Sequence, residues 1–141
     1  MALPTWQEIN PHDDLDGRAA AEHFYGKTLD DAEALLRDNP LYYQEDLMFM
    51  GPIAFRCYVH AVIRFLHSEA AAGDADFISC FARILQFRLE NEPDELAPVA
   101  AELATTCQYV LDRWSRFDAT PDTYGDLRGR YQSIIHWLAR L

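Results

Sequence analysis

The chain has 141 residues, a length that fits one domain able to fold without a disulfide or a metal ion. Half of the residues are hydrophobic, and 23 acidic against 12 basic residues give a net charge of −11, which disfavours a disordered chain and a nucleic-acid-binding protein. The sequence lacks a run of about 18 apolar residues and a signal-peptide pattern, and so predicts a cytoplasmic protein that does not enter a membrane.

The acidic residues gather in the first third of the chain. Residues 1–52 hold 11 acidic and three basic residues, a net charge of −8, whereas residues 53–141 hold 12 and nine, a net charge of −3. An acidic block repels phosphate backbones and anionic lipids and attracts a basic partner. The simpler alternative is that this charge only keeps a small protein soluble.

The first residues have the composition of turns. Residues 1–16 include "NPHDD" and predict an extended lead-in that Trp6 and Ile9 attach to the body. Residues 17–52 then form an acidic N-terminal segment.

Two helices are predicted at the start of this acidic segment. Residues 18–25 indicate a short helix that ends at Gly26. Thr28 is a typical N-cap, acidic residues follow it where the helix dipole favours them, and Pro40 ends the pattern. We therefore expect a helix that starts after Thr28 and stops before Pro40.

The sequence "LYYQEDLMFMGPIAF", residues 41–55, is unusually rich in aromatic and thioether side chains. Tyr43, Leu47 and Met50 are spaced to share one buried helical face. Gly51 interrupts the chain, and Pro52 suits the first position of the next helix.

Two adjacent carboxylates, Glu45 and Asp46, lie within this apolar sequence. On a helix, neighbouring side chains point about 100° apart, so the two cannot share a proton as a catalytic dyad does. A buried carboxylate needs a partner, and we predict an ion pair with Arg56 or Arg64 of the following helix.

The body, residues 53–141, shows helical periodicity and no sustained alternation of the kind that strands need. Asp74 or Asp76 is expected to cap its second helix, and Pro98 lies early enough in the third to be tolerated. The expected helices cover residues 52–73, 75–92, 93–117 and 124–140. We predict a single all-α domain over residues 1–141, a helical bundle of about four main helices plus one or two short N-terminal helices.

Neither the cysteines nor the histidines have the spacing of a metal site. Cys57, Cys80 and Cys107 lie about 25 residues apart among apolar residues, so we expect reduced, buried thiols. His60 and His67 are seven positions apart, wider than the pairs that ligate metals in helical bundles. Cys57 could meet His60 across one helical turn, a weak signal for nucleophilic catalysis. We predict no cofactor and no metal.

The leading functional hypothesis is a small acidic interaction protein without enzymatic activity, which binds a basic protein partner. One form of it is a bacterial inhibitor or immunity-type protein that covers the cationic site of a toxin or nuclease. The partner-binding surface is predicted to consist of acidic residues and tyrosines of two consecutive helices: Asp30, Asp31, Glu33, Asp38, Tyr42, Tyr43, Glu45 and Asp46.

The alternative hypothesis is an enzyme, or a protein that binds a small ligand or a metal between its helices. Its site would use the basic residues that share one face of the helix at 52–73, namely Arg56, His60, Arg64 and His67. A simpler explanation of these residues is that the acidic N-terminal third folds back onto them. A homodimer through residues 47–50, or through the exposed side of the helix at 75–92, is compatible with either hypothesis.

Overall fold

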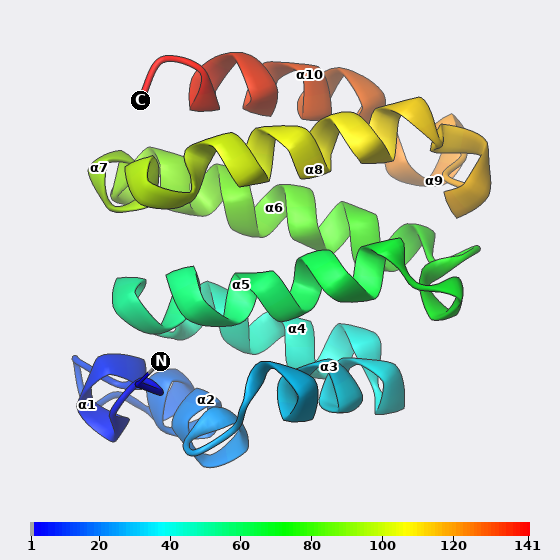
Figure 1. The fold of residues 1–141 in the computed structure, drawn as a ribbon. Helices are drawn as coiled ribbons and strands as arrows, with labels where there is room; N and C mark the ends of the chain where they lie inside the picture. The colour runs from blue at the N-terminus through cyan, green and yellow to red at the C-terminus, as the bar shows by residue number, and fades with distance from the viewer. Residues whose placement is uncertain (1) are drawn as a thin grey trace. The chain divides into compact units, whose positions relative to one another are not determined.

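The fold was analysed in a computed structural model, which describes residues 2–141. Every regular element in this part of the chain is a helix, so the prediction of an all-α protein is confirmed (Figure 1). The chain divides into two compact units, residues 1–70 and 71–141. The division falls between Ala70 and Ala71, and the expectation of a single domain over residues 1–141 stays a prediction.

The first unit begins with a helix where an extended lead-in was expected. Helix α1, Trp6–Ile9, starts at a capping box in which Thr5 and Glu8 each accept a hydrogen bond from the other's backbone amide. The Ile9 side chain is fully buried, whereas Trp6 stays 40% exposed. The expectation of an extended lead-in is therefore wrong at these residues, because local capping stabilises one helical turn.

Four longer helices complete this unit: α2 (Leu15–Phe24), α3 (Leu29–Asp38), α4 (Pro40–Phe49) and α5 (Pro52–His67). Asp14 caps α2, so this helix starts earlier than expected. The predicted cap of α3 is confirmed, since the Thr28 hydroxyl accepts from the Asp31 amide at 3.1 Å. Proline occupies the first position of α4 and of α5, as predicted for Pro52.

Helix α5 ends six residues before the predicted stop at Gly73. The Ser68 backbone is extended, and its hydroxyl donates to the Phe65 carbonyl oxygen at 2.6 Å. This local bond competes with continuation of the helix, and a 3₁₀ turn over Glu69–Ala71 follows.

The helices of the first unit pack around a core rich in aromatic residues. Helix α3 packs on both α4 and α5, α2 packs on α1 and α4, and α1 packs on α5. The buried Tyr58 hydroxyl of α5 lies 2.9 Å from the Phe24 carbonyl oxygen and 2.8 Å from that of Lys27. Gly51 lies so close to α1 that a Cβ atom there would stand 2.4 Å from the Glu8 carbonyl oxygen, so this bend requires glycine.

The second unit contains α6 (Ala75–Asn91), α7 (Pro93–Leu96), α8 (Ala100–Asp112), α9 (Pro121–Tyr124) and α10 (Leu127–Leu138). Of the two predicted caps of α6, Asp74 is the one that accepts from a helix amide, that of Phe77. The single helix expected over 93–117 is wrong. A 3₁₀ turn at Ala97–Val99, which contains Pro98, separates α7 from α8, and a second at Trp114–Phe117 follows α8.

The last predicted helix starts later than expected. Tyr124 belongs to α9, and Gly125, with φ of +63°, separates it from α10. Asp126 then caps α10 by accepting from the Gly129 amide at 3.0 Å. Because such breaks divide the predicted segments, the helices outnumber the four main ones expected.

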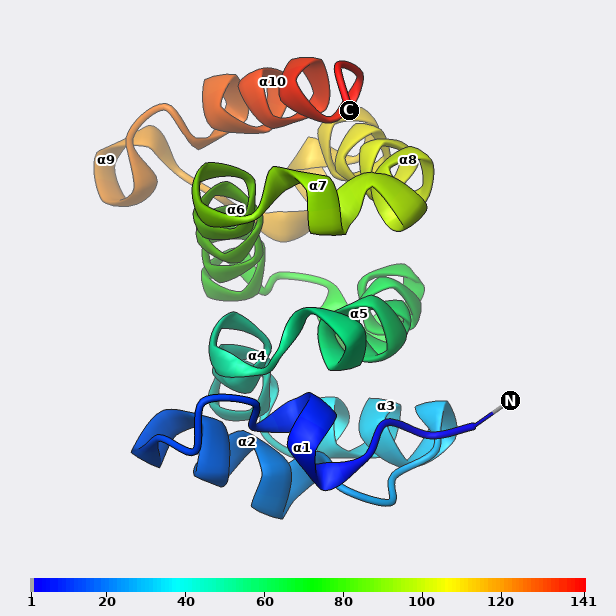
Figure 2. The same cartoon turned by 90° about the vertical axis from the view of Figure 1, so that its left-hand side faces the viewer.

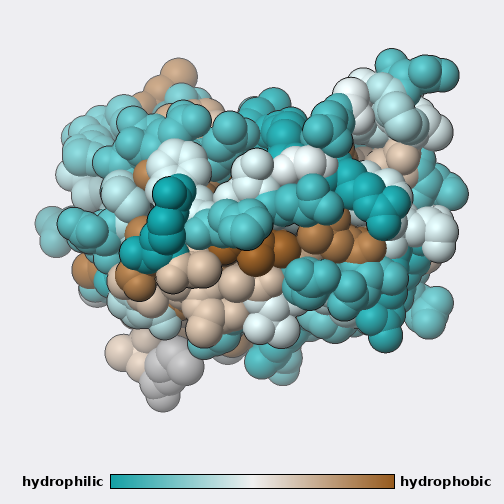
Figure 3. Space-filling model, turned by 90° about the horizontal axis from the view of Figure 1, so that it is seen from above, coloured by the Kyte–Doolittle hydropathy of each residue, from teal (hydrophilic) through white to brown (hydrophobic). Residues whose placement is uncertain are grey.

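Helix α10 packs on both α8 and α6 (Figure 2). The buried Tyr131 hydroxyl ties α10 to α6 by donating to the Ile78 carbonyl oxygen at 2.5 Å. Seen from above, the surface shows a band of hydrophobic residues between rows of hydrophilic side chains (Figure 3). No helix in residues 2–141 has both the length and the apolar character needed to cross a bilayer.

Candidate functional site

A pocket between α2 and α4, in the first unit, contains three of the predicted site residues, Tyr42, Glu45 and Asp46. Its volume is about 240 Å³ and it is open to solvent. Each helix contributes residues three or four positions apart, which the helical repeat places on one face. The lining residues are Asp16, Ala19, His23, Tyr42, Glu45, Asp46 and Phe49.

The close approach of α2 and α4 follows from the sequence of α2. Its "RAAAEHF" segment contains three alanines: Ala19 lines the pocket, and Ala20 and Ala21 are fully buried. Small side chains let the helix axes come together, so His23 of α2 reaches the residues of α4.

A hydrogen-bonded chain of three side chains lines this pocket. The Asp46 carboxylate lies 2.7 Å from Nδ1 of His23, and the Tyr42 hydroxyl lies 3.3 Å from Nε2 of the same ring. An ionised carboxylate only accepts hydrogen bonds, so Nδ1 of His23 carries a proton and donates to Asp46. The direction of the second bond follows the charge of the ring: Nε2 accepts from Tyr42 when the ring is neutral and donates to Tyr42 when it is protonated.

Asp46 is the buried member of this chain, with 7% of its surface exposed. Burial raises the pKa of the Asp46 carboxyl, and the hydrogen bond and charge of His23 counteract this effect in part. The prediction that a carboxylate in this apolar segment needs a partner is confirmed for Asp46. The predicted arginine is wrong for this carboxylate, because its partner is His23.

Aromatic rings hold His23 in place. Its ring centroid lies 5.3 Å from that of Tyr42 and 5.2 Å from that of Tyr43, and the two tyrosine rings lie 5.0 Å apart. Tyr42 is 53% exposed, whereas Tyr43 is half-buried. Tyr42 is thus the tyrosine of the pair that offers substantial surface to a ligand.

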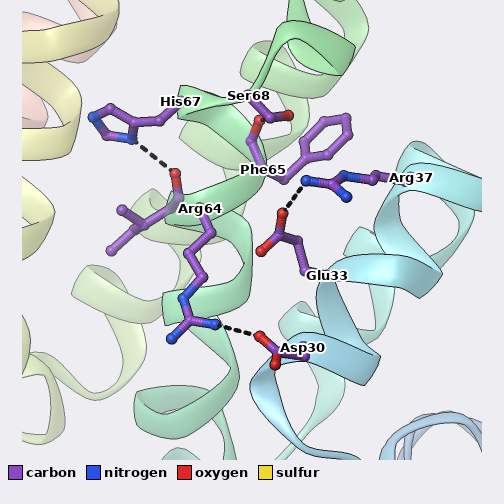
Figure 4. A network of polar contacts seen from close by, with 8 residues as sticks. Asp30, Glu33, Arg37, Arg64, Phe65, His67 and Ser68 are labelled. Carbon is purple, nitrogen blue, oxygen red and sulfur yellow. Dashed lines mark hydrogen bonds and ion pairs between the residues drawn. The ribbon is translucent and has the colours of Figure 1, made fainter.

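Several carboxylates of the predicted partner-binding surface have partners within the unit. Asp30 lies 3.0 Å from Nη1 of Arg64, and Glu33 lies 2.5 Å from Nη2 of Arg37 (Figure 4). Asp31 accepts from the Thr28 amide, and this bond lowers the pKa of its carboxyl.

Asp38 and Glu45 are the other carboxylates of that predicted surface. Both are exposed, and neither forms a hydrogen bond or an ion pair within residues 2–141. Only part of the predicted partner-binding surface therefore offers carboxylates to a partner. These are Asp38, at the end of α3, and Glu45, on α4.

The predicted alternative site extends along α5. Arg64 contacts Asp30, and Nδ1 of the exposed His67 lies 2.8 Å from the Ile63 carbonyl oxygen (Figure 4). Arg56 and His60 are half-buried. The Arg64–Asp30 contact agrees with the expectation that the acidic N-terminal residues fold back onto this face. In residues 2–141, no three histidine, cysteine or acidic side chains are grouped as metal ligands.

His23 and Asp16 were missed as site residues. Asp16, Ala19 and His23 share one face of α2, and their spacing in the sequence indicates this. The sequence does not indicate which helix that face contacts. The pairing of His23 with Asp46, 23 positions later, depends on the packing of α2 on α4.

The second unit has two further open pockets. One, of about 320 Å³, includes Trp114 and Arg128, whose guanidinium lies 5.6 Å from the indole ring. The other, of about 350 Å³, includes Arg130, which donates to the Gln86 side chain at 3.1 Å. Neither contains a residue from the predicted sites.

Comparison of the chain with protein-family models, with curated proteins and with solved structures gave no match in any of the three. Its function is therefore inferred from the residues of the first unit and from the charge around them.

Proposed function

We propose that the protein is a small acidic interaction protein, without enzymatic activity, that binds a basic protein partner through the exposed surface of α4 and the adjoining parts of α2 and α3. One observation carries this proposal: the pocket contains three carboxylates, one histidine and no lysine or arginine. Charged groups of one sign around a concave surface concentrate the field there and attract the opposite charge.

The charge of the whole unit supports the same assignment. Residues 1–70 contain 12 acidic and five basic side chains, a net charge of −7, and residues 71–141 contain 11 and seven, a net charge of −4. Helix α4 has two carboxylates and no basic residue. A basic partner would be steered towards this unit, and faster association is the usual effect of such steering.

The residues available to the partner are fewer than the sequence suggested. Asp38, Tyr42 and Glu45 are exposed, and Asp16 adds a further exposed carboxylate beside the pocket. Tyrosine is enriched among the residues that contribute most to binding at protein interfaces. We assign Asp46 a supporting role, because it is buried and holds His23.

An inhibitor or immunity-type protein of a bacterium, active in the cytoplasm, is the concrete form that we propose. A site for a small ligand or metal around His60 and His67 is the alternative, and elemental analysis of the purified protein tests its metal form. A homodimer through residues 47–50 or through α6 also stays a prediction, which the mass of the protein in solution tests.

The binding proposal is tested by capture from a lysate of the source organism with two charge-reversed variants. Asp38→Arg/Glu45→Arg changes the proposed surface. Glu90→Arg/Asp122→Arg makes the same change in net charge at exposed positions of the second unit. Wild type and the second variant should retain a basic protein at low salt, and the first should lose it. Equal retention by both variants would contradict the proposal.

A further inference from the structure

The pocket between α2 and α4 has the chemistry to recognise one particular side chain of a partner. Its walls include the exposed rings of Tyr42 and Phe49, and its charged groups include Asp16 and Glu45. We propose that this pocket receives the guanidinium group of a single arginine of the basic partner. The inference rests on the function proposed above and names the group that the site binds.

The size of the pocket fits one side chain. Sites for drug-sized ligands and cofactors usually measure about 300–1,000 Å³ and bury most of the ligand. This pocket measures about 240 Å³ and is open to solvent, so it holds the end of a side chain whose backbone stays outside.

The charges of the pocket favour a cation. Asp16 and Glu45 form no hydrogen bond or ion pair within residues 2–141, so their carboxylates remain available to a ligand. Asp46 differs, because His23 already occupies one of its oxygens. The field in the pocket is thus set by two exposed carboxylates beside a paired one, and it disfavours an anion.

The Tyr42 hydroxyl, which contacts Nε2 of His23, gives an argument that does not depend on the carboxylates. When His23 is neutral, Tyr42 donates to its Nε2, and the lone pairs of the Tyr42 oxygen are left to accept. A ligand that donates a hydrogen bond suits this oxygen. A guanidinium group has five N–H donors and no acceptor, so it fits this requirement.

The aromatic walls favour arginine over lysine. Tyr42 is 53% exposed and Phe49 is 39% exposed, so both offer ring surface in the pocket. A guanidinium group is planar, stacks on aromatic rings and pairs with a carboxylate through two parallel hydrogen bonds. An ammonium group carries the same charge but neither stacks nor forms that paired contact.

The direct test is titration of the full-length protein with N-acetyl-arginine amide, followed by the backbone amide signals in NMR spectra. Citrulline amide, which has almost the same shape without the charge, and lysine amide are the matched ligands. We expect the signals of α2 and α4 to shift with arginine amide, at least threefold weaker binding of lysine amide, and no shift with citrulline amide. Equal binding of arginine and citrulline, or shifts confined to other helices, would overturn the inference.

Two variants separate this inference from the proposed function. Glu45→Gln and Tyr42→Phe should each weaken the binding of arginine amide at least threefold. Glu90→Gln and Tyr25→Phe, at exposed positions elsewhere, should leave this binding unchanged. Tyr25→Phe also keeps the ring that contacts Trp6. Suppose that Asp38→Arg/Glu45→Arg abolishes capture of the basic protein while Glu45→Gln and Tyr42→Phe change neither the binding of arginine amide nor that capture. In that case the arginine pocket is wrong and the proposed function stands.

Discussion

At the scale of single residues, Asp46 shows how the protein places a carboxylate inside an apolar segment. Burial disfavours its charged form, and the bond to His23 offsets only part of that cost. The pKa of Asp46 is therefore raised above 3.8, the usual value for aspartate. A carboxyl with a higher pKa in the folded protein than in the unfolded chain lowers stability as it ionises, so its cost grows as the pH rises above 3.8.

Asp46→Asn should remove this pH dependence while keeping an oxygen that accepts from His23. We expect the free energy of unfolding of the variant, relative to wild type, to increase as the pH rises from below 3.8 through the acidic range. Thermal unfolding of both proteins over a pH series measures the difference. Two curves that stay parallel would show that Asp46 ionises as easily in the folded protein as in the unfolded chain.

Gln44 is a second residue whose burial has a measurable cost. It is fully buried on α4, and neither its Oε1 nor its Nε2 has a hydrogen-bond partner within residues 2–141. An unpaired polar group in the interior costs roughly 1–3 kcal/mol. Gln44 lies outside the lining of the pocket, so its replacement leaves the candidate site unchanged.

Gln44→Met keeps a long unbranched side chain and removes both polar groups. It should raise the free energy of unfolding by about 1 kcal/mol, measured by chemical denaturation. A loss of stability would contradict this expectation.

At the scale of elements, the helix starts that carry a typical capping residue were predictable at α3 and α6. Thr28 and Asp74 have the side chains that cap helices, and both accept the expected backbone amides. The breaks at Ser68 and Pro98 were missed, because the helical pattern of apolar residues continues through both. The candidate site was predictable only as single residues, since the contact of His23 with Asp46 joins two helices whose packing no local signal reveals.

The cap of α3 gives a prediction at this scale. Thr28→Ala removes the hydroxyl that accepts from the Asp31 amide, and should lower the free energy of unfolding by about 1 kcal/mol. Thr105→Ala is the matched control: Thr105 is exposed inside α8, where alanine is the better helix former, so this change should leave stability equal or slightly higher. Unfolding by denaturant measures the free energy of unfolding of both variants. Equal losses of stability would show that the Thr28 cap does not contribute specifically.

At the scale of the whole molecule, the net charge of −11 is uneven, and the structure indicates which part of it is available to a partner. Ion pairs such as Arg64–Asp30 and Arg37–Glu33 use some of the acidic groups within the first unit. Asp16, Asp38 and Glu45 stay exposed, without an ion pair in residues 2–141. Binding through these three carboxylates should weaken as salt screens them, since the Debye length falls to about 10 Å at 0.1 M salt.

The measurement that tests this account most directly is the affinity of the purified basic partner for wild type and for Asp38→Arg/Glu45→Arg, by titration calorimetry at about 50 and 300 mM NaCl. We predict that wild-type binding weakens as salt rises, and that the reversed variant binds at least about tenfold more weakly at low salt. Glu90→Arg/Asp122→Arg, with the same net charge, should bind like wild type. Binding that is insensitive to salt, or equal losses in the two variants, would contradict a specific acidic surface on α3 and α4.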